Sequence, residues 1–145
     1  MTDPDPKVVR QVLSELRDVS KEKRRTAVMK LGMLGGDEAI RTLIMVVTNT
    51  HEDLIARGRA ALMLGKLGDP RAVEPLIRAL DAPGYQTPLY AAQSLGKLGD
   101  PRAIEPLLRI IQSHNDKMRE AAQEALERLG YNGEPQGEQV SEPEA

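Results

Sequence analysis

The feature of this sequence that most constrains its fold is an internal repeat. The segment LGKLGDPRAVEPLIR at 64–78 recurs with two conservative changes as LGKLGDPRAIEPLLR at 95–109, so the copies start 31 residues apart. A weaker copy, LGMLGGDEAIRTLI, begins at Leu31, and LERLG ends a fourth copy at Gly130. A repeat with this period predicts a stacked fold in which every unit buries its apolar side against its neighbours.

The repeat divides most of the chain into four units. The beginning of the chain fits the pattern too, because DPKVVRQVL from Asp5 aligns with DPRAVEPLI from Asp69. We therefore predict an N-terminal extension at 1–4, a repeat body at 5–130 and a tail at 131–145. The predicted units are 5–35, 36–68, 69–99 and 100–130.

Within each unit the apolar residues have the spacing of two short helices. In the third unit Ala72, Leu76 and Leu80 are four residues apart, which places them on one face of a first helix. Asp69 is typical of the residue that caps the start of such a helix, and Pro70 of its first position.

The second helix of each unit contains a leucine, here called the motif leucine, and ends at a glycine suited to a left-handed helix end. In three units another glycine directly follows the motif leucine. A glycine inside a helix lowers helix stability, so its recurrence predicts that neighbouring helices approach closely there. The motif leucines are Leu31, Leu64, Leu95 and Leu126, and the three glycines are Gly32, Gly65 and Gly96.

These patterns together predict the fold class. A hairpin of two short helices cannot bury its apolar face alone, so the four hairpins must stack around one continuous core. We predict an all-α protein, a right-handed α-solenoid of four helical hairpins with eight helices.

Two segments carry a resemblance to a known family. AALMLGKLGDPRAVEPLIRAL and AAQSLGKLGDPRAIEPLLRII resemble HEAT-like repeats of the phycobilisome-lyase type, and the similarity covers 5–130. The resemblance implies a solenoid whose second helices line the concave surface. It also implies a superfamily that contains bilin lyase subunits, scaffolds and adaptors.

The composition offers little for catalysis or for binding a cofactor. The chain has no cysteine, tryptophan or phenylalanine, and its two histidines, His51 and His114, fall in predicted turns of different units. A nucleophilic site needs a histidine and a carboxylate beside the nucleophile, and transition-metal sites usually need several His or Cys ligands. We expect no enzymatic activity, no metal and no cofactor.

Charge and hydropathy narrow the choice of partners. With 20 Lys and Arg against 22 Asp and Glu, the net charge is −2, which provides no overall basic field for nucleic acid. No apolar run approaches the roughly 18 residues of a membrane helix, and the terminal helices are polar enough to act as caps. We expect a cytoplasmic monomer that binds neither nucleic acid nor membranes.

The period of the α-helix, about 100° per residue, identifies the outward side of the second helices. When the motif leucine points inward, the residues five and two positions before it and two positions after it point outward. The row two positions after it is cationic in three units, with Lys66, Lys97 and Arg128.

Methionine, leucine and tyrosine lie beside this row, where a solvated face would be polar. Such residues next to Arg and Lys are typical of recognition surfaces. We call the predicted binding set the partner face and expect it to bind a protein segment that is acidic and partly apolar. The alternative is that these side chains only cover one another between neighbouring helices. The partner face comprises Met29, Met33, Arg59, Leu62, Lys66, Tyr85, Tyr90, Gln93, Lys97 and Arg128.

The third unit differs from the others where its second helix begins. Thr87 is suited to cap a helix and Pro88 to start it, which predicts a helix about one turn shorter than its relatives and an open end of the groove near Tyr85. The alternative is a tight turn at Pro83-Gly84, with Tyr85 filling the gap.

In the other three units an arginine stands seven residues before the motif leucine. Arg24, Arg57 and Arg119 occupy this position, and we interpret them as members of a ladder that links neighbouring units, with Asp81 as the expected partner of Arg57.

The tail at 131–145 contains four glutamates and no basic residue, a composition that predicts disorder. It would act either as a solubilising segment or as a shield for the basic groove. As the function of the whole chain we predict a non-enzymatic scaffold or adaptor. The alternative, from the resemblance alone, is a bilin lyase subunit or a lyase-like chaperone for a tetrapyrrole-carrying protein.

Overall fold

The computed structural model describes residues 3–131, and this part of the chain is built from helices with no strand. Short 3₁₀ turns, Pro70–Ala72 and Pro101–Ala103, precede α5 and α7. The first helices of the four pairs are α1 (Pro6–Glu15), α3 (Asp37–Thr48), α5 (Val73–Ala79) and α7 (Ile104–Ile110). The second helices are α2 (Lys21–Leu34), α4 (Leu54–Leu67), α6 (Gln86–Leu98) and α8 (Asp116–Arg128).

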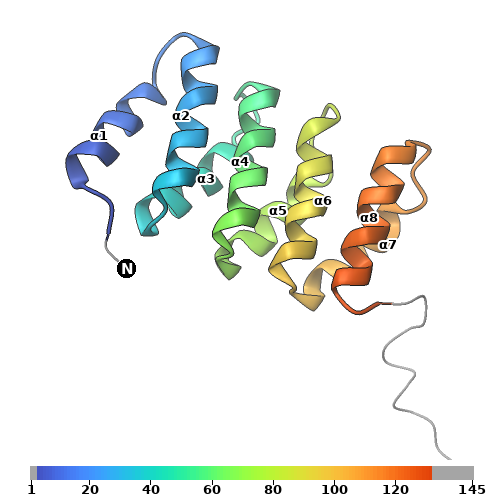
Figure 1. Ribbon diagram of the computed structural model, residues 1–145. Coiled ribbons are helices and arrows are strands. Elements are labelled where there is room, and N and C mark those ends of the chain that lie inside the picture. The colour runs from blue at the N-terminus through green and yellow to red at the C-terminus, as the bar shows by residue number, and fades with distance from the viewer. Residues whose placement is uncertain (1–2, 132–145) are drawn as a thin grey trace, which may run out of the picture.

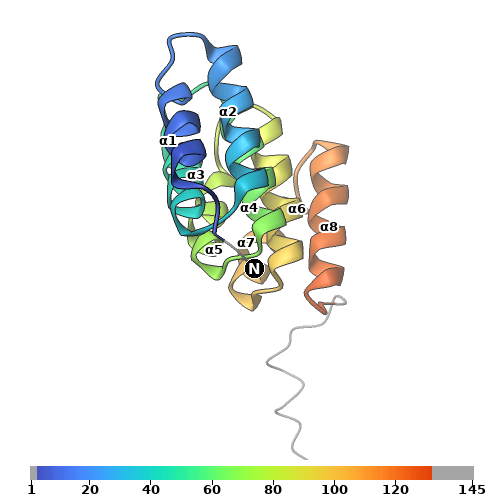
Figure 2. The ribbon, with the colours of Figure 1, turned by 60° about the vertical axis from the view of Figure 1, so that its left-hand side comes forward.

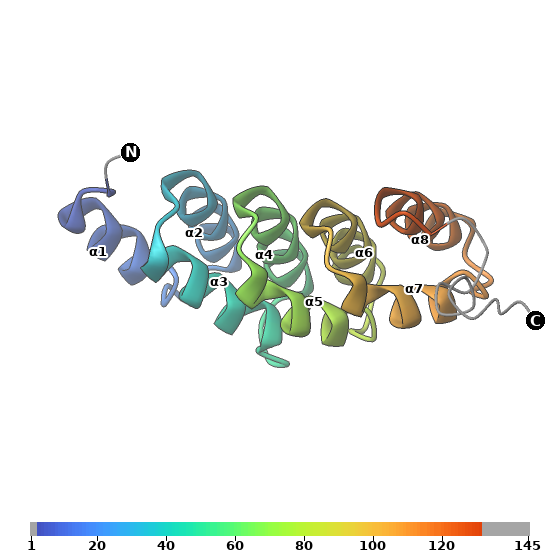
Figure 3. The ribbon, with the colours of Figure 1, turned by 90° about the horizontal axis from the view of Figure 1, so that it is seen from below.

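The helix pairs stack side by side into two layers, and the predicted all-α solenoid is confirmed. One layer holds α2, α4, α6 and α8, and the other holds α1, α3, α5 and α7 (Figures 1 and 2). Neighbouring second helices are in direct contact along the whole row. The row is bowed so that its outer side is gently hollow (Figure 3). The core between the layers contains the four motif leucines, which are all buried.

The helix ends predicted at Gly68 and Asp69 are confirmed, with one refinement at the start of the first helix of the third unit. The Asp69 carboxylate accepts a hydrogen bond from the Arg71 amide at 2.8 Å, and Gly68 ends α4 with φ of 73°. The first turn is a 3₁₀ turn because Pro75 has no N–H and its ring would clash with the carbonyl of Arg71 in an α-helix. Pro106 stands in the same place before α7.

The glycines after the motif leucines lie where neighbouring helices touch, as predicted. A Cβ atom on Gly65 would lie 2.6 Å from the Cβ and 2.9 Å from the Cα of Ser94 on α6. On Gly96 it would lie 2.9 Å from the Cα of Ala125 on α8, and on Gly32 it would lie 2.7 Å from the Cβ of Met63 on α4. Only glycine allows this spacing of the second helices.

The α4–α6 contact also contains a buried hydrogen bond, for which we predict a modest contribution to stability. The Ser94 hydroxyl donates to the Ala61 carbonyl at 2.7 Å. We expect Ser94→Ala to lower the free energy of unfolding by about 1 kcal/mol, the usual net value of such a bond. Urea unfolding measures the loss. The same change at Ser14, which is exposed on α1, is the control and should have less than half the effect; an equal loss would contradict the role of the buried bond.

The prediction of a shortened helix in the third unit is wrong. α6 begins at Gln86 and has 13 residues, as α8 has, and its N-cap is Tyr85 without a side-chain hydrogen bond. Pro88 stands third in the helix, where no N–H is needed for the helical ladder. Thr87 is buried and its hydroxyl donates to the Leu54 carbonyl of α4 at 3.2 Å.

The first turn of α6 fills the space that Tyr85 was expected to plug. It packs against Gly58 of α4, since a Cβ at that glycine would lie 3.2 Å from the Cβ of Gln86. Tyr85 itself is 42% exposed. The predicted open end is therefore wrong. Of the alternative, the turn at Pro83-Gly84 is present as a bend, with a φ of 83° at Gly84, but no missing turn leaves a gap for Tyr85 to fill.

The recurring arginines bind backbone carbonyls that precede their own helix, in the loop for Arg24 and Arg119 and in the last turn of α3 for Arg57. Arg24 Nη1 donates to the carbonyls of Asp18 and Val19, and Arg119 Nη1 donates to that of Ser113. Arg57 Nε donates to the Val47 carbonyl at 3.1 Å. The predicted ion pair of Arg57 with Asp81 is not formed within residues 3–131: Nε of Arg57 is bound to Val47, and the Asp81 side chain is exposed.

Ion pairs between units involve other residues: Asp37–Arg71 at 2.7 Å joins the second unit to the third, Glu74–Arg102 at 3.3 Å joins the third to the fourth, and two pairs join the first to the second. Arg24 is paired with Glu52 at 3.0 Å, and Arg25 contacts Asp53 through two hydrogen bonds of 2.6 and 2.9 Å. Both pairs join α2 to the loop before α4.

The predicted tail falls outside the described residues except for its first one. Tyr131 donates from its backbone N–H to the Leu126 carbonyl at 2.9 Å, and its half-buried side chain packs against the core. None of the helices between residues 3 and 131 has the length and hydropathy needed to cross a membrane.

Candidate protein-interaction face

The outward rows of the second helices differ in exposure. Met33, Lys66, Lys97 and Arg128 are exposed, Met33 with 84% of its surface. All four stand in the last turn of their helices, so they form one row along the hollow side of the solenoid. With interhelix spacings of 8–10 Å, this row is roughly 25–30 Å long.

The cations of this row are available to a partner. Among residues 3–131, no carboxylate oxygen lies within ion-pair distance of Lys66, Lys97 or Arg128. The described part of the chain therefore leaves three positive charges on one edge without acidic neighbours in contact.

Three apolar residues of the partner face form its floor. Met29, Leu62 and Tyr90 are half-buried and pack against the core. Arg59 is half-buried and Gln93 is exposed. The apolar residues thus both cover the core and show part of their surface between the helices.

A shallow hollow of about 190 Å³ lies on this side between α6 and α8. Gln93 and Lys97 of α6 and Arg128 of α8 line it, and Ala121 and Ala125 add small side chains. Glu124 brings one negative charge to the same hollow. Three residues of the partner face are therefore brought together around one depression.

Tyr85 is not part of this arrangement. It precedes the first residue of α6, whereas Lys97 lies in the last turn of the same helix. Twelve residues of helix separate the two, a distance of about 18 Å. The structure therefore places Tyr85 at the loop edge of the solenoid, away from the cationic row.

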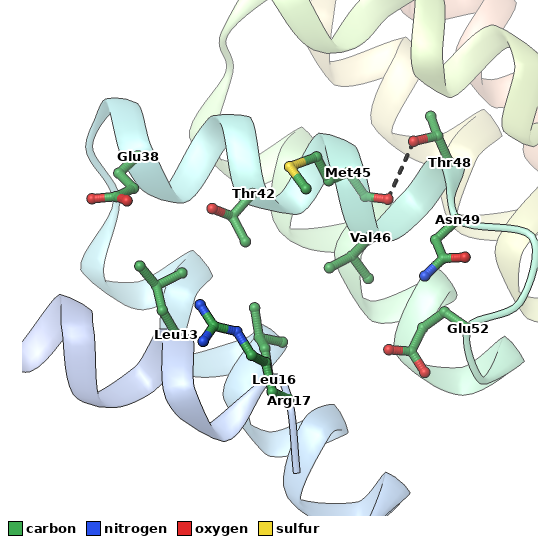
Figure 4. Close-up of a pocket in the computed structure, with 10 residues that line it drawn as sticks. All are labelled: Leu13, Leu16, Arg17, Glu38, Thr42, Met45, Val46, Thr48, Asn49 and Glu52. Carbon is green, nitrogen blue, oxygen red and sulfur yellow. Dashed lines mark hydrogen bonds between the residues drawn. The ribbon is translucent and has the colours of Figure 1, made fainter. Parts of the chain in front are cut away.

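A second groove, of about 570 Å³, lies between α1 and α3 and was not predicted (Figure 4). Leu13 of α1 and Leu16 at its C-terminal cap face Met45 and Val46 of α3 across it, and Met45 is 68% exposed. One signal in the sequence could have found it. Met45 aligns with arginines of the third and fourth units, at 78 and 109, so an apolar residue replaces an exposed cation.

The histidines lie apart in exposed loops, His51 before α4 and His114 before α8. Between residues 3 and 131, no three His, Asp or Glu side chains gather in a way that could hold a metal ion.

Comparison with known families agrees with this geometry. The signature of HEAT repeats matches residues 9–87 and 82–137. The chain is a HEAT-repeat protein. No protein with a curated description matches its sequence.

Among solved structures, this HEAT-repeat protein is similar to a chain of the complex of CpcE and CpcF of phycocyanin lyase from Nostoc sp. PCC7120. The TM-score is 0.73 at 26% identity, and the match covers 84% of this chain and 53% of the other. The chain thus spans about half the length of that neighbour. The resemblance to phycobilisome-lyase HEAT-like repeats is confirmed.

Proposed function

We propose that this HEAT-repeat protein is a non-enzymatic scaffold or adaptor that binds a partner protein through the second-helix side of the solenoid. The observation that carries the proposal is the row of Lys66, Lys97 and Arg128, exposed and without carboxylate contacts within residues 3–131, beside the exposed Met33. The structural neighbour, a complex of two chains, supports a role in assembly.

The chemistry of the row favours a segment that is acidic and partly apolar. The three cations would attract and orient carboxylates, while Met33 and the half-buried Met29 and Leu62 would contact apolar side chains. Because the cations are exposed, added salt should weaken the complex, mainly by slowing association.

The test is capture of partners by two variants with equal changes in charge. The face variant combines Met33→Glu, Lys66→Glu and Lys97→Glu. The control combines Met45→Glu with Arg10→Glu and Arg109→Glu, which are exposed residues of the first helices. We expect the wild type and the control to retain the same protein, and the face variant to bind it at least about ten-fold more weakly.

Circular dichroism must show that both variants are folded. Equal retention by the face variant, or equal loss by the control, would contradict the assignment of the binding surface. Tyr85→Ala tests separately whether the loop edge of the solenoid contributes to binding. Because Tyr85 lies far from the cationic row, we expect this variant to retain the partner as the wild type does.

The alternative function is that of a lyase subunit or lyase-like chaperone, which the similarity to the phycocyanin lyase structure favours. It predicts that the protein changes the absorbance spectrum of a bilin on mixing, and that a tetrapyrrole-carrying protein is the partner retained. The scaffold proposal predicts no spectral change with the bilin alone.

A further inference from the structure

Arg57 is a cation enclosed in the loop edge of the solenoid without an acidic partner. It is 5% exposed, and its Nε donates to the Val47 carbonyl at 3.1 Å. Its Nη1 is fully enclosed and has no hydrogen-bond acceptor among the described residues. An enclosed guanidinium normally has its donors satisfied by a carboxylate, since burying an unpaired charge is unfavourable.

The first unit shows how the hydrogen-bond donors of the equivalent arginine are satisfied when an acidic residue is present. Arg24 stands where Arg57 stands in the next unit, and it binds both oxygens of Glu52 through Nε at 3.1 and 3.2 Å. Glu52 lies twelve residues before the motif leucine of its unit, and Pro83 occupies that position in the third unit. The unit next to Arg57 therefore lacks the carboxylate that the unit next to Arg24 provides.

A pocket of about 260 Å³ opens beside Arg57 in the place of that missing acid. It is lined by Val47 and Thr50 of the second unit and by Arg78, Asp81 and Pro83 of the third. Arg57 itself lines the pocket, and its Nε is held by the carbonyl of Val47, another lining residue. Arg78 adds a second cation to the lining. The volume of the pocket suits one carboxylate-bearing group rather than a whole helix.

We propose that this pocket, here called the Arg57 pocket, binds a single carboxylate from outside the chain. The planar fork of a guanidinium matches the two oxygens of a carboxylate, and the Arg25–Asp53 pair shows this geometry in the same protein, with Nε 2.6 Å and Nη2 2.9 Å from the two oxygens. The carboxylate comes either from a small acid or from an acidic side chain of a partner. The site lies at the loop edge and is separate from the cationic row of the proposed function.

Asp81 is the competing group within the chain. It lines the same pocket and is exposed, but it forms no ion pair with Arg57 in the described structure. A rearrangement of Asp81 toward Arg57 would fill the site internally, so the experiment must distinguish this occupant from an external one.

The test is nuclear magnetic resonance of the arginine Nε–Hε groups in the full-length protein during titration with sodium acetate. Sodium chloride at equal ionic strength is the reference, and the resonance missing from Arg57→Met identifies Arg57. We expect a saturable shift of the Arg57 resonance with acetate only. The Arg24 side chain is already bound to Glu52, so its resonance is an internal control and should not shift.

Two further experiments identify the group that occupies the Arg57 pocket. Pro83→Glu supplies the missing acid within the chain, so its Arg57 resonance should no longer respond to acetate. Titration with the peptide N-acetyl-Gly-Glu-Gly-amide distinguishes the source: binding of the peptide indicates an acidic side chain, and binding of acetate alone indicates a small acid.

Three results would overturn the proposal. The first is the absence of a saturable acetate shift in the wild type. The second is an equal shift of the Arg24 resonance. The third is a response that appears only in Asp81→Asn, which would show that Asp81 fills the pocket. Resonance assignment of the wild-type protein through its backbone identifies Arg57 independently of Arg57→Met, so the proposal is tested even if a variant does not fold.

Discussion

Substitution of Gly65 by leucine is expected to cause the largest loss of stability of any single change on the second helices. The α4–α6 contact is so close that even the first added carbon would lie 2.9 Å from the Cα atom of Ser94. The helices must move apart, because a backbone atom, unlike a flexible side chain, has no other position. We expect the free energy of unfolding to fall by about 3 kcal/mol or more, and the melting temperature by roughly 10 °C.

Leucine is chosen because it favours the helix itself. Its helix propensity is higher than that of glycine by close to 1 kcal/mol, so any loss must come from packing. Gly99→Ala is the control, since this helix-ending glycine has no atom within 4 Å of an added Cβ and the change should cost only about 1 kcal/mol for its positive φ. A loss at Gly65 no larger than at Gly99 would contradict the close packing of α4 and α6.

Loss of Asp53 is expected to be the second largest effect, because this carboxylate has two structural roles. It caps α4 by accepting a hydrogen bond from the Ala56 amide at 3.0 Å, and it binds Arg25 of the previous unit. A cap contributes about 1 kcal/mol, and a well-aligned, mostly enclosed ion pair adds roughly 1–2 kcal/mol. We expect Asp53→Ala to lower the free energy of unfolding by about 2–3 kcal/mol in urea unfolding at neutral pH.

The ion pair also gives a pH dependence with a defined sign. The hydrogen bonds from Arg25 lower the pKa of Asp53 from 3.8 to about 2. Between these two values the unfolded chain binds more protons than the folded one, so stability falls as the pH falls through this range. The contribution is fully present above about pH 5.

Asp53→Asn is the matched variant for this effect, because asparagine also caps helices but does not titrate. We expect the wild type to be more stable than Asp53→Asn at pH 7 by roughly 1–2 kcal/mol. Most of this difference should be gone at pH 2. A difference that stays constant between pH 7 and pH 2 would show that Asp53 does not act through its charge.

The stacking of the helices could be predicted because the repeat encodes it locally. Asp69, Pro70 and Gly68 mark helix ends through their own backbone preferences. Gly65 and Gly96 recur at one position because a Cβ atom there would meet the next helix. Such constraints act within one unit and its neighbour, so comparing units along the sequence is enough to find them.

The start of α6 and the partner of Arg57 could not be predicted because they depend on contacts between units. Thr87 is by type a good cap, yet its hydroxyl bonds to Leu54 of the neighbouring helix, and the helix begins before it. Arg57 and Asp81 have complementary charges, but which atoms meet depends on the loop conformation. In the loop of the third unit, Pro83 stands at the position that Glu52 occupies in the second unit.

The side of the solenoid that carries the candidate site could be predicted, but not every residue that belongs to the site. Helical phase alone placed Met33, Lys66 and Lys97 on the outward side, because exposure within a helix follows its period. The position of Tyr85 depended on where α6 starts, which phase does not give. The groove at Met45 depends on how far α1 lies from α3, a distance that no pattern within one helix encodes.

The most direct test of the proposed function is photocrosslinking from two matched methionine positions. Met33 lies on the hollow side of the second helices and Met45 on the first-helix layer, and both are largely exposed. A photoreactive amino acid is placed at one or the other position, and the protein is irradiated together with its captured partner. A crosslink from position 33 and none from position 45 is the result expected for binding through the second-helix side. A crosslink from position 45 alone would contradict it.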